Sequence, residues 1–234
     1  MSDLQRMIEG NLARVRASIA AAATRAGRPP ETVKLVGVTK YVGPEVVRAL
    51  VAAGLRDLAE SRPQQLWEKA AALADLPLRW HQVGHLQRNK VRRTVPLVAM
   101  VESVDSVRLA AAIDQVAAER GRRVPVLLEV NISGEAAKHG FAPSEVEAAL
   151  GAVAGLGHME VRGLMGMAGL EGHLEDARRQ FASLRDLRDR LQPVCPNGIA
   201  LAELSMGMSA DFEVAIEEGA SMVRIGSALF EGVL

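Results

Sequence analysis

The sequence predicts a single α/β domain, a (β/α)8 TIM barrel, with an extra N-terminal helix. From Val33 onward, short apolar runs alternate with longer amphipathic stretches, which is typical of parallel strands joined by crossover helices. The alternation repeats eight times, as a closed barrel requires. The 234 residues also suit one such barrel, which commonly takes about 200–250 residues. No linker rich in Pro, Ser or Gly divides the chain, so residues 1–234 are predicted to form one domain.

An amphipathic helix is predicted within residues 1–28. Ser2 and Gln5 have the spacing of a capping box. Apolar residues then recur at helical spacing until one glycine and two prolines end the pattern: Leu4, Ile8, Leu12, Val15 and Ile19, then Gly27, Pro29 and Pro30. We expect this helix to pack on the outside of the barrel.

The expected strands are short and apolar, and several helical stretches between them begin with Pro or Ser and end with Gly. Strands are expected at residues 34–39, 57–59, 78–82, 97–101, 125–131, 160–165, 199–204 and 222–225. Helices are expected at 44–53, 107–120, 143–154 and 174–191. The second strand is short enough to belong to a loop instead.

An open, doubly wound sheet is the alternative architecture. It would normally carry a glycine-rich turn of the GxGxxG or GxxxxGKS type after the first strand. Residues 38–43 are Val-Thr-Lys-Tyr-Val-Gly, which match neither pattern. The barrel is therefore favoured.

Composition and charge disfavour several classes of protein. The 28 Lys+Arg balance the 28 Asp+Glu, so the chain has no general attraction to nucleic acid or to anionic membranes. The apolar stretch 19–23 is too short to be a membrane span or a signal sequence. Cys195 is the single cysteine, and no CxxC or HExxH motif is present. A cytoplasmic protein without a metal centre is expected.

Lys40 stands at the end of the first expected strand, and barrels place their functional residues at such strand ends. Five of the 28 basic residues are lysines, so an arginine would be more usual at this position. A partly desolvated lysine amine can lose its proton and condense with an aldehyde, whereas arginine cannot. The alternative is a solvated lysine with no chemical role.

The last two strand ends both lead into turns of small residues. Ser-Met-Gly-Met-Ser at 205–209 follows the seventh strand, and Ile-Gly-Ser at 225–227 follows the eighth. Loops at these two places form the usual phosphate site of a (β/α)8 barrel, because free amides, Gly and Ser can surround an anion. Alternatively, Ser209 and Ser227 simply cap helices.

Arg224 lies inside the eighth expected strand, where an unpaired guanidinium would be costly. Facing outward, it could pair with Glu217 or Glu218. Facing inward, it could donate a hydrogen bond to a ring nitrogen of a bound cofactor.

Two polar segments have structural interpretations. His81 and His85 follow the third strand, but their spacing does not place them on one face and no nearby third ligand is evident, so structural histidines are favoured over a metal site. Residues 131–140, after the fifth strand, could be no more than a capped turn.

With these positions assembled, the chain resembles the pyridoxal-phosphate homeostasis protein family, whose fold matches the barrel domain of alanine racemase. The residues that carry this resemblance are Val38-Thr39-Lys40, the segment 80–90, Asn131-Ile132-Ser133 with Lys138 and Gly140, the segment 162–165, the segment 204–209 with Asp211, and the segment 222–226 with Phe230. It implies a Schiff base between pyridoxal 5'-phosphate and Lys40, phosphate held by Ser209 and the turn of Gly226 and Ser227, a further cofactor contact from Met208, and Arg224 facing the pyridine nitrogen. The chain departs from the family at Ala59 and Ser61, where Gly and Asn are usual. The departure puts in doubt a cofactor hydrogen bond from the missing Asn amide.

Three functions follow from these residues. The first is a non-catalytic carrier that holds the cofactor, and the resemblance implies a monomer that could pass it to apo-enzymes in transient contacts. The second is a racemase or decarboxylase that uses the same cofactor. The third is a barrel aldolase, which typically places its Schiff-base lysine on a later strand.

The enzyme is disfavoured on two grounds. The chain ends at Leu234 without the β domain that supplies a tyrosine to alanine racemase, and Tyr41, next to Lys40, is expected to point the opposite way if the first strand continues to these residues. An arginine opposite the pyridine nitrogen also weakens the ring as an electron sink.

Overall fold

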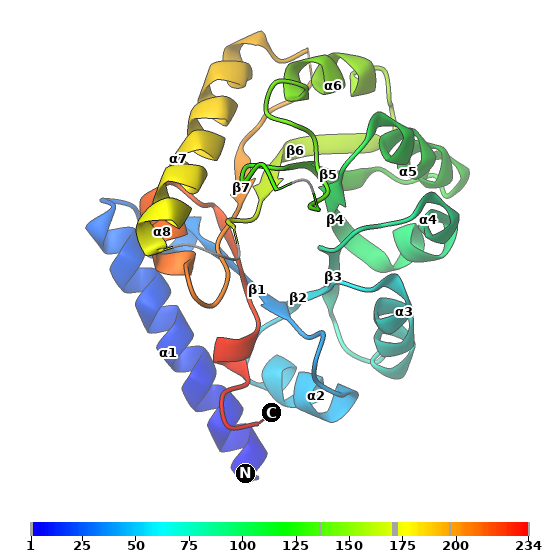
Figure 1. The fold of residues 1–234 in the computed structure, drawn as a ribbon. Helices are drawn as coiled ribbons and strands as arrows, with labels where there is room; N and C mark the ends of the chain where they lie inside the picture. The colour runs from blue at the N-terminus through cyan, green and yellow to red at the C-terminus, as the bar shows by residue number, and fades with distance from the viewer. Residues whose placement is uncertain (1, 136, 170–172, 197, 234) are drawn as a thin grey trace.

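The computed structural model describes residues 2–135, 137–169, 173–196 and 198–233. Its strands form a closed parallel barrel in chain order from β1 to β8, which confirms the predicted fold (Figure 1). The strands are β1 (Lys34–Val38), β2 (Asp57–Glu60), β3 (Arg79–Gln82), β4 (Val98–Val104), β5 (Val124–Val130), β6 (Met159–Gly166), β7 (Glu203–Ser205) and β8 (Met222–Ile225). The short second strand is real, since it pairs with both neighbours.

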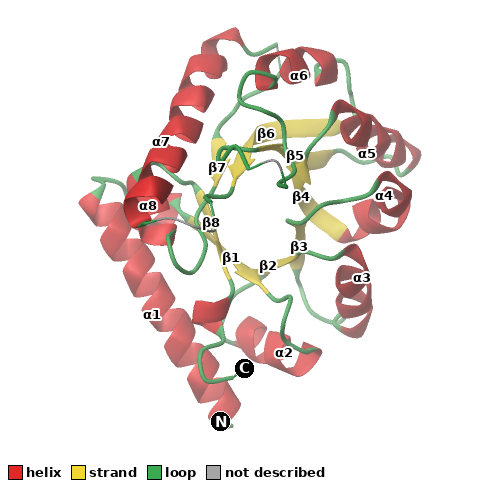
Figure 2. Cartoon of the chain, viewed as in Figure 1, coloured by secondary structure: helices red, strands yellow, loops and turns green. Residues whose placement is uncertain are grey.

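Helices surround the barrel as an outer ring (Figure 2). They are α1 (Asp3–Arg25), α2 (Pro44–Ala52), α3 (Pro63–Ala72), α4 (Arg88–Thr94), α5 (Val107–Glu119), α6 (Val146–Val153), α7 (Leu174–Leu191) and α8 (Phe212–Glu217), with short 3-10 turns η1 (Pro30–Thr32), η2 (Val95–Leu97), η3 (Gln192–Val194) and η4 (Ser227–Leu229). Among the described residues, none of these helices combines the length and the apolarity needed to cross a bilayer.

The N-terminal helix forms as its sequence predicts. Ser2 Oγ accepts the amide N–H of Gln5, which caps the helix, and the apolar face is buried against α2, α8 and η4. Asn11 adds a polar contact, because its side-chain amide donates to the carbonyls of Leu229 and Glu231. The two ends of the chain are therefore held together.

Three element boundaries differ from the prediction by three residues or more. Strand β4 ends at Val104 rather than at Val101. Strand β7 begins at Glu203 rather than at Ile199. The preceding backbone is bonded elsewhere: the amide of Ile199 donates to the carbonyl of Pro196, and that of Leu201 donates to the side chain of Gln192. Helix α6 begins at Val146 rather than at residue 143. At β7 the apolar pattern extends beyond the hydrogen-bonded strand, whereas at α6 the residues before the helix are Pro143, Ser144 and Glu145.

Apolar side chains separate into two clusters. The larger lies between the sheet and the helices. The smaller comprises Val36, Ala59, Met100, Leu127, Met165 and Met222, one residue from each of six strands. These residues alternate along their strands with members of the larger cluster, as expected when a strand has one face inside a barrel and one outside. The smaller cluster therefore belongs to the barrel interior, where polar groups accompany it.

Candidate functional site

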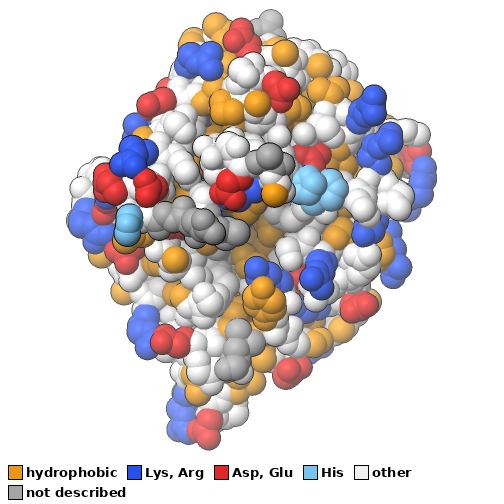
Figure 3. Space-filling view, in the orientation of Figure 1, with side chains coloured by type: hydrophobic (Ala, Val, Ile, Leu, Met, Phe, Trp, Pro, Cys, Tyr) orange, Lys and Arg blue, Asp and Glu red, His pale blue; other side chains and the backbone are white. Residues whose placement is uncertain are grey.

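The six residues proposed from the sequence lie around one cavity of about 390 Å³ at the carboxyl end of the barrel. Figure 3 shows the hollow near the centre of this face. The predicted residues Lys40, Met208, Ser209, Arg224, Gly226 and Ser227 line it, together with Val38, Tyr41, Ser61, Val83, Gly84, Met167, Ala210 and Phe230. A cavity of this size is in the range of small-molecule sites.

Lys40 follows β1 and is exposed, with Nζ 4.8 Å from the centre of the Tyr41 ring. Tyr41 would point away from Lys40 only if β1 continued to these residues; the strand ends before them, and both residues line the cavity. Strand β1 ends at Val38, and the amide of Val42 then donates to the carbonyl of Thr39 to close a turn. Strand alternation therefore no longer applies at Lys40 and Tyr41.

Arg224 faces the barrel interior, with a relative exposure of 4%. Its guanidinium donates to Ser205 Oγ at 2.5 Å and to the carbonyl of Gly166 at 2.9 Å. The outward alternative is wrong, because Glu217 and Glu218 pair with arginines of α1 and α7 instead. The remaining guanidinium surface lines the cavity.

A chain of buried polar groups continues from Arg224 across the barrel. Ser205 donates from Oγ to Glu102 Oε2 at 2.6 Å. The other carboxyl oxygen of Glu102 lies 2.6 Å from His81 Nδ1, and His81 Nε2 lies 3.4 Å from Asp57 Oδ1. The structural interpretation of His81 is therefore confirmed, and its partners hold the network that orients Arg224.

Charge in this network is balanced despite its burial. Burial alone would lower the pKa of His81, but its hydrogen bonds to Asp57 and Glu102 raise that pKa to about 9. Burial opposes ionisation of Glu102, yet the His81 hydrogen bond and the charge of Arg224 keep its pKa below the usual value. His81 is therefore cationic and lies between the carboxylates of Asp57 and Glu102.

We expect this histidine to make stability depend on pH. The pKa of His81 rises from 6.5 in the unfolded chain to about 9 on folding, so its contribution is fully present below pH 6.5 and is lost as pH rises through 9. The effect is on the order of 3 kcal/mol. Urea unfolding of the wild type and of His81→Gln at both ends of this range measures it. A wild-type advantage that grows toward pH 9 would contradict the assignment.

Ser209 connects the two turns at the other end of the cavity. Its Oγ accepts the amide N–H groups of Gly226 at 3.2 Å and Ala228 at 3.4 Å. It does not cap α8, which begins after Asp211. A hydroxyl and two amides therefore converge where the sequence predicted an anion site.

One further carbon atom would fit beside Gly226. A Cβ atom built there would come no closer than 3.5 Å to any protein atom outside its chain neighbours, the nearest being the carbonyl oxygen of Val38. Since Gly226 also lines the cavity, this room is available to a ligand. The residues present therefore fit a small ligand that carries an anionic group, an aldehyde and a ring nitrogen.

The loops after β2 and β3 are closely packed. Gly84 lies so near the backbone of Ser61 that a Cβ would sit 2.3 Å from the Ser61 carbonyl oxygen. That carbonyl accepts a hydrogen bond from Gln82 Nε2 at 3.1 Å. Ser61, which stands where the family usually has Asn, thus still reaches the cavity. Ala59 is fully buried in the interior cluster.

Sequence reasoning missed one group beneath Lys40. Lys69 Nζ donates to the carbonyl of Thr39 at 2.6 Å and to Glu60 Oε1. Thr39 donates from Oγ1 to the same carboxyl oxygen at 2.7 Å. The available signal was helical spacing, since Lys69 lies three residues after the buried Leu66 in α3. The buried ion pair holds the backbone just before Lys40.

Comparison with known proteins agrees with this geometry. A family model described as "Alanine racemase, N-terminal domain" matches residues 10–232. A relative from Aquifex aeolicus named "Pyridoxal phosphate homeostasis protein" is 43% identical over 219 residues, which cover 94% of this chain and 95% of the relative. The chain belongs to the pyridoxal phosphate homeostasis protein family. The resemblance drawn from the sequence is confirmed.

Solved structures of similar proteins show the same fold over nearly the whole of both chains. A protein from Bifidobacterium adolescentis has a TM-score of 0.92 at 37% identity, covering 98% of this chain and 97% of that one. PipY of Synechococcus elongatus, in a structure described as having PLP bound, has a TM-score of 0.84 at 36% identity, covering 95% and 99%. The barrel described here is therefore the fold of these similar proteins.

Proposed function

We propose that this protein binds pyridoxal 5'-phosphate in the cavity through Lys40 and serves intracellular homeostasis of this cofactor as a non-catalytic carrier. The observation that carries the proposal is the convergence of an exposed lysine, a buried arginine and the Ser209 turn on one cavity of about 390 Å³. The relative with PLP bound supports the same ligand.

Each side chain has a role that follows from its contacts. The cofactor supplies an aldehyde, which forms a C=N bond with a primary amine and releases water. Lys40 provides the amine at the cavity wall, and the turns containing Met208, Ser209, Gly226 and Ser227 receive the phosphate. Arg224 is held by Ser205 and Gly166, so its orientation is set before a ligand enters. Because arginine keeps its proton, it can donate a hydrogen bond to a ring nitrogen without protonating it.

Removing the Ser209 hydroxyl is expected to weaken phosphate binding by about 1–3 kcal/mol, roughly a 5- to 150-fold rise in Kd. Ser209 Oγ accepts from the amides of Gly226 and Ala228, so its own proton can be donated to a phosphate oxygen, and alanine removes this donor. Titration with pyridoxal 5'-phosphate and with pyridoxal measures the effect in the wild type and in Ser209→Ala, with the exposed Ser183→Ala as control. If the wild type bound pyridoxal 5'-phosphate and pyridoxal with equal affinity, the proposed phosphate site would be contradicted.

A carrier should bind the cofactor without turning over amino acids. Arg224 does not protonate the ring nitrogen, which weakens the ring as an electron sink for carbanions. We therefore expect no substantial racemase, decarboxylase or transaminase activity when common amino acids are assayed with Lys40→Ala as the blank. Lys40-dependent turnover at an ordinary enzymatic rate of about 1 to 10³ per second would contradict the proposed carrier function.

A second candidate is a racemase or decarboxylase using the same cofactor. The position of Tyr41 favours it, because this phenol lies beside Lys40 at the cavity instead of pointing away. Tyrosine at such a position can exchange a proton with a substrate. Turnover that is present in the wild type and lost in Tyr41→Phe, with cofactor binding intact, would establish this alternative.

The proposal extends to the setting in which the carrier works. We propose one cofactor-binding unit over residues 1–234, monomeric and cytoplasmic, that delivers the cofactor to apo-enzymes in transient contacts. The balanced charge supports a protein with no nucleic-acid or membrane partner. Among the described residues, the exposed large apolar side chains come from separate parts of the sequence: Met7, Tyr41, Leu97, Val107, Leu174 and Val194. This distribution supports a monomer.

A further inference from the structure

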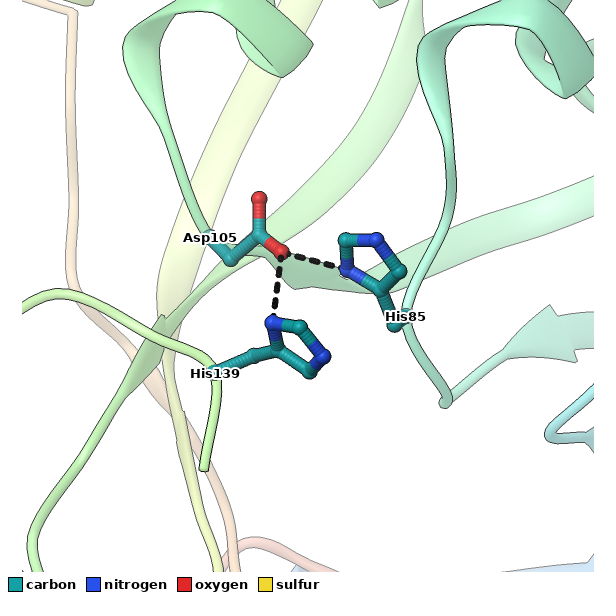
Figure 4. Close-up of side chains that lie close together, drawn as sticks. All are labelled: His85, Asp105 and His139. Atoms are coloured by element: carbon teal, nitrogen blue, oxygen red, sulfur yellow. Dashed lines mark hydrogen bonds and ion pairs between the residues drawn. The ribbon is translucent and has the colours of Figure 1, made fainter. Parts of the chain in front are cut away.

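Three potential metal ligands meet beside the cavity, on the loops that follow β3, β4 and β5 (Figure 4). His85 Nδ1 lies 2.8 Å from Asp105 Oδ2, and His139 Nδ1 lies 3.9 Å from the same oxygen. One ligand atom from each residue lies within 4.8 Å of the other two. The sequence analysis found no third ligand for His85, because Asp105 and His139 are distant along the chain.

We propose that His85, Asp105 and His139 bind a divalent transition-metal ion such as Zn²⁺. Two imidazoles and one carboxylate form a common ligand set for this class of ion, with further positions left for water or an oxygen ligand. Zinc ligands lie about 2.0–2.2 Å from the ion, so three of them in tetrahedral geometry are about 3.4 Å apart. His85 Nδ1 and Asp105 Oδ2, at 2.8 Å, therefore need to move slightly apart, whereas His139 Nδ1, at 3.9 Å, needs to move closer to that oxygen.

The two histidines can make this movement. Their rings stack with centroids 4.0 Å apart and planes 11° apart, and their side chains are 40% and 57% exposed. Rotation about the side-chain bonds can therefore turn the ring nitrogens toward one point without disturbing the core.

The backbones that carry the ligands are held in place. The carbonyl of Gly84, next to His85, accepts hydrogen bonds from Gln82 Nε2 at 2.8 Å and Ser103 Oγ at 2.7 Å. After His139, the amide of Phe141 donates to the carbonyl of Glu129 at 2.8 Å. A fixed backbone with movable rings lowers the entropy lost on binding an ion.

Charges around the cluster favour a cation. Asp105 accepts the Ser106 hydroxyl on Oδ1 at 3.1 Å, which leaves Oδ2 facing the histidines. The nearby Lys138 is already bonded to Glu135 and to the carbonyl of Ala168. Asp105 thus supplies a carboxylate oxygen at the cluster.

Titration of the full-length protein with Zn²⁺, followed by calorimetry, tests the proposal. We expect one ion per chain, and a Kd that rises at least about tenfold in His85→Ala and in His139→Ala. The control is His158→Ala, an exposed histidine outside the cluster, which should bind as the wild type does. Co²⁺ should show visible absorption bands of a site with nitrogen ligands, and Mg²⁺, which prefers oxygen ligands, should not compete.

A cofactor bound in the cavity could itself chelate metal. The variant Lys40→Ala therefore distinguishes zinc binding at the His85, Asp105 and His139 cluster from zinc binding at the proposed cofactor site. Zinc affinity unchanged in Lys40→Ala supports the cluster. Loss of zinc binding in Lys40→Ala would place the ion in the cofactor cavity and overturn the proposal. Failure to bind one ion, or equal weakening in His158→Ala and His85→Ala, would also overturn it. Thermal unfolding without metal shows that each variant is folded.

Discussion

Substitution of Lys40 by alanine is expected to abolish covalent attachment of pyridoxal 5'-phosphate. Lys40 Nζ is the lysine amine at the cavity, and alanine offers no nucleophile. Wild-type protein mixed with the cofactor should turn yellow, and borohydride should fix a pyridoxyl group on Lys40 that peptide mass spectrometry locates. In Lys40→Ala both signals should be lost. Noncovalent binding through the phosphate turn should remain measurable, since the contacts of Ser209 do not involve Lys40.

Lys34→Ala is the matched control for this experiment. Lys34 is the first residue of β1, at the opposite end of the strand from Lys40, so its loss should leave the adduct unchanged. An adduct found mainly on Lys34, Lys69, Lys90 or Lys138 would contradict the assignment of Lys40.

Replacement of Lys69 by methionine is expected to destabilise the protein by about 3–5 kcal/mol, because it leaves the buried Glu60 carboxylate without its cation. Glu60 is fully buried, and its Oε2 has no hydrogen-bond partner even in the intact structure. The carbonyl of Thr39 would also lose its lysine donor. Urea unfolding of cofactor-free protein measures the loss.

The double variant Glu60→Gln with Lys69→Met provides the control for charge. Replacing both members of a buried ion pair by neutral groups costs much less than removing one. The double variant should therefore recover most of the stability lost in Lys69→Met. Equal losses in the single and double variants would show that packing, rather than an unpaired carboxylate, sets the stability at this position.

Much of the fold was predictable from the sequence because it depends on local patterns. Apolar runs alternating with amphipathic stretches predicted eight strands in order, and Ser2 with the spacing of Ile8 and Leu12 predicted α1. The position of Lys40 at a strand end and the small-residue turns around Ser209 and Gly226 predicted which residues line the cavity. These inferences hold because the end of each strand in a parallel barrel faces the same side of the molecule.

The direction of individual side chains was decided by the tertiary structure. Strand β8 is buried on both faces, so its pattern could not show whether Arg224 faces inward. Its orientation depends on Ser205 and Gly166, which belong to other strands. The side-chain direction of Tyr41 depended on where β1 stops, which the apolar pattern does not mark.

The sequence by itself determined the barrel, the N-terminal helix and the residues expected at the cavity. Only the tertiary structure brought Lys69 under Thr39 and placed Asp105 and His139 beside His85. The physical reason is the range of the interactions. Helical and strand periodicity arises between residues a few positions apart, whereas these polar clusters join loops and helices that become neighbours only when the barrel closes.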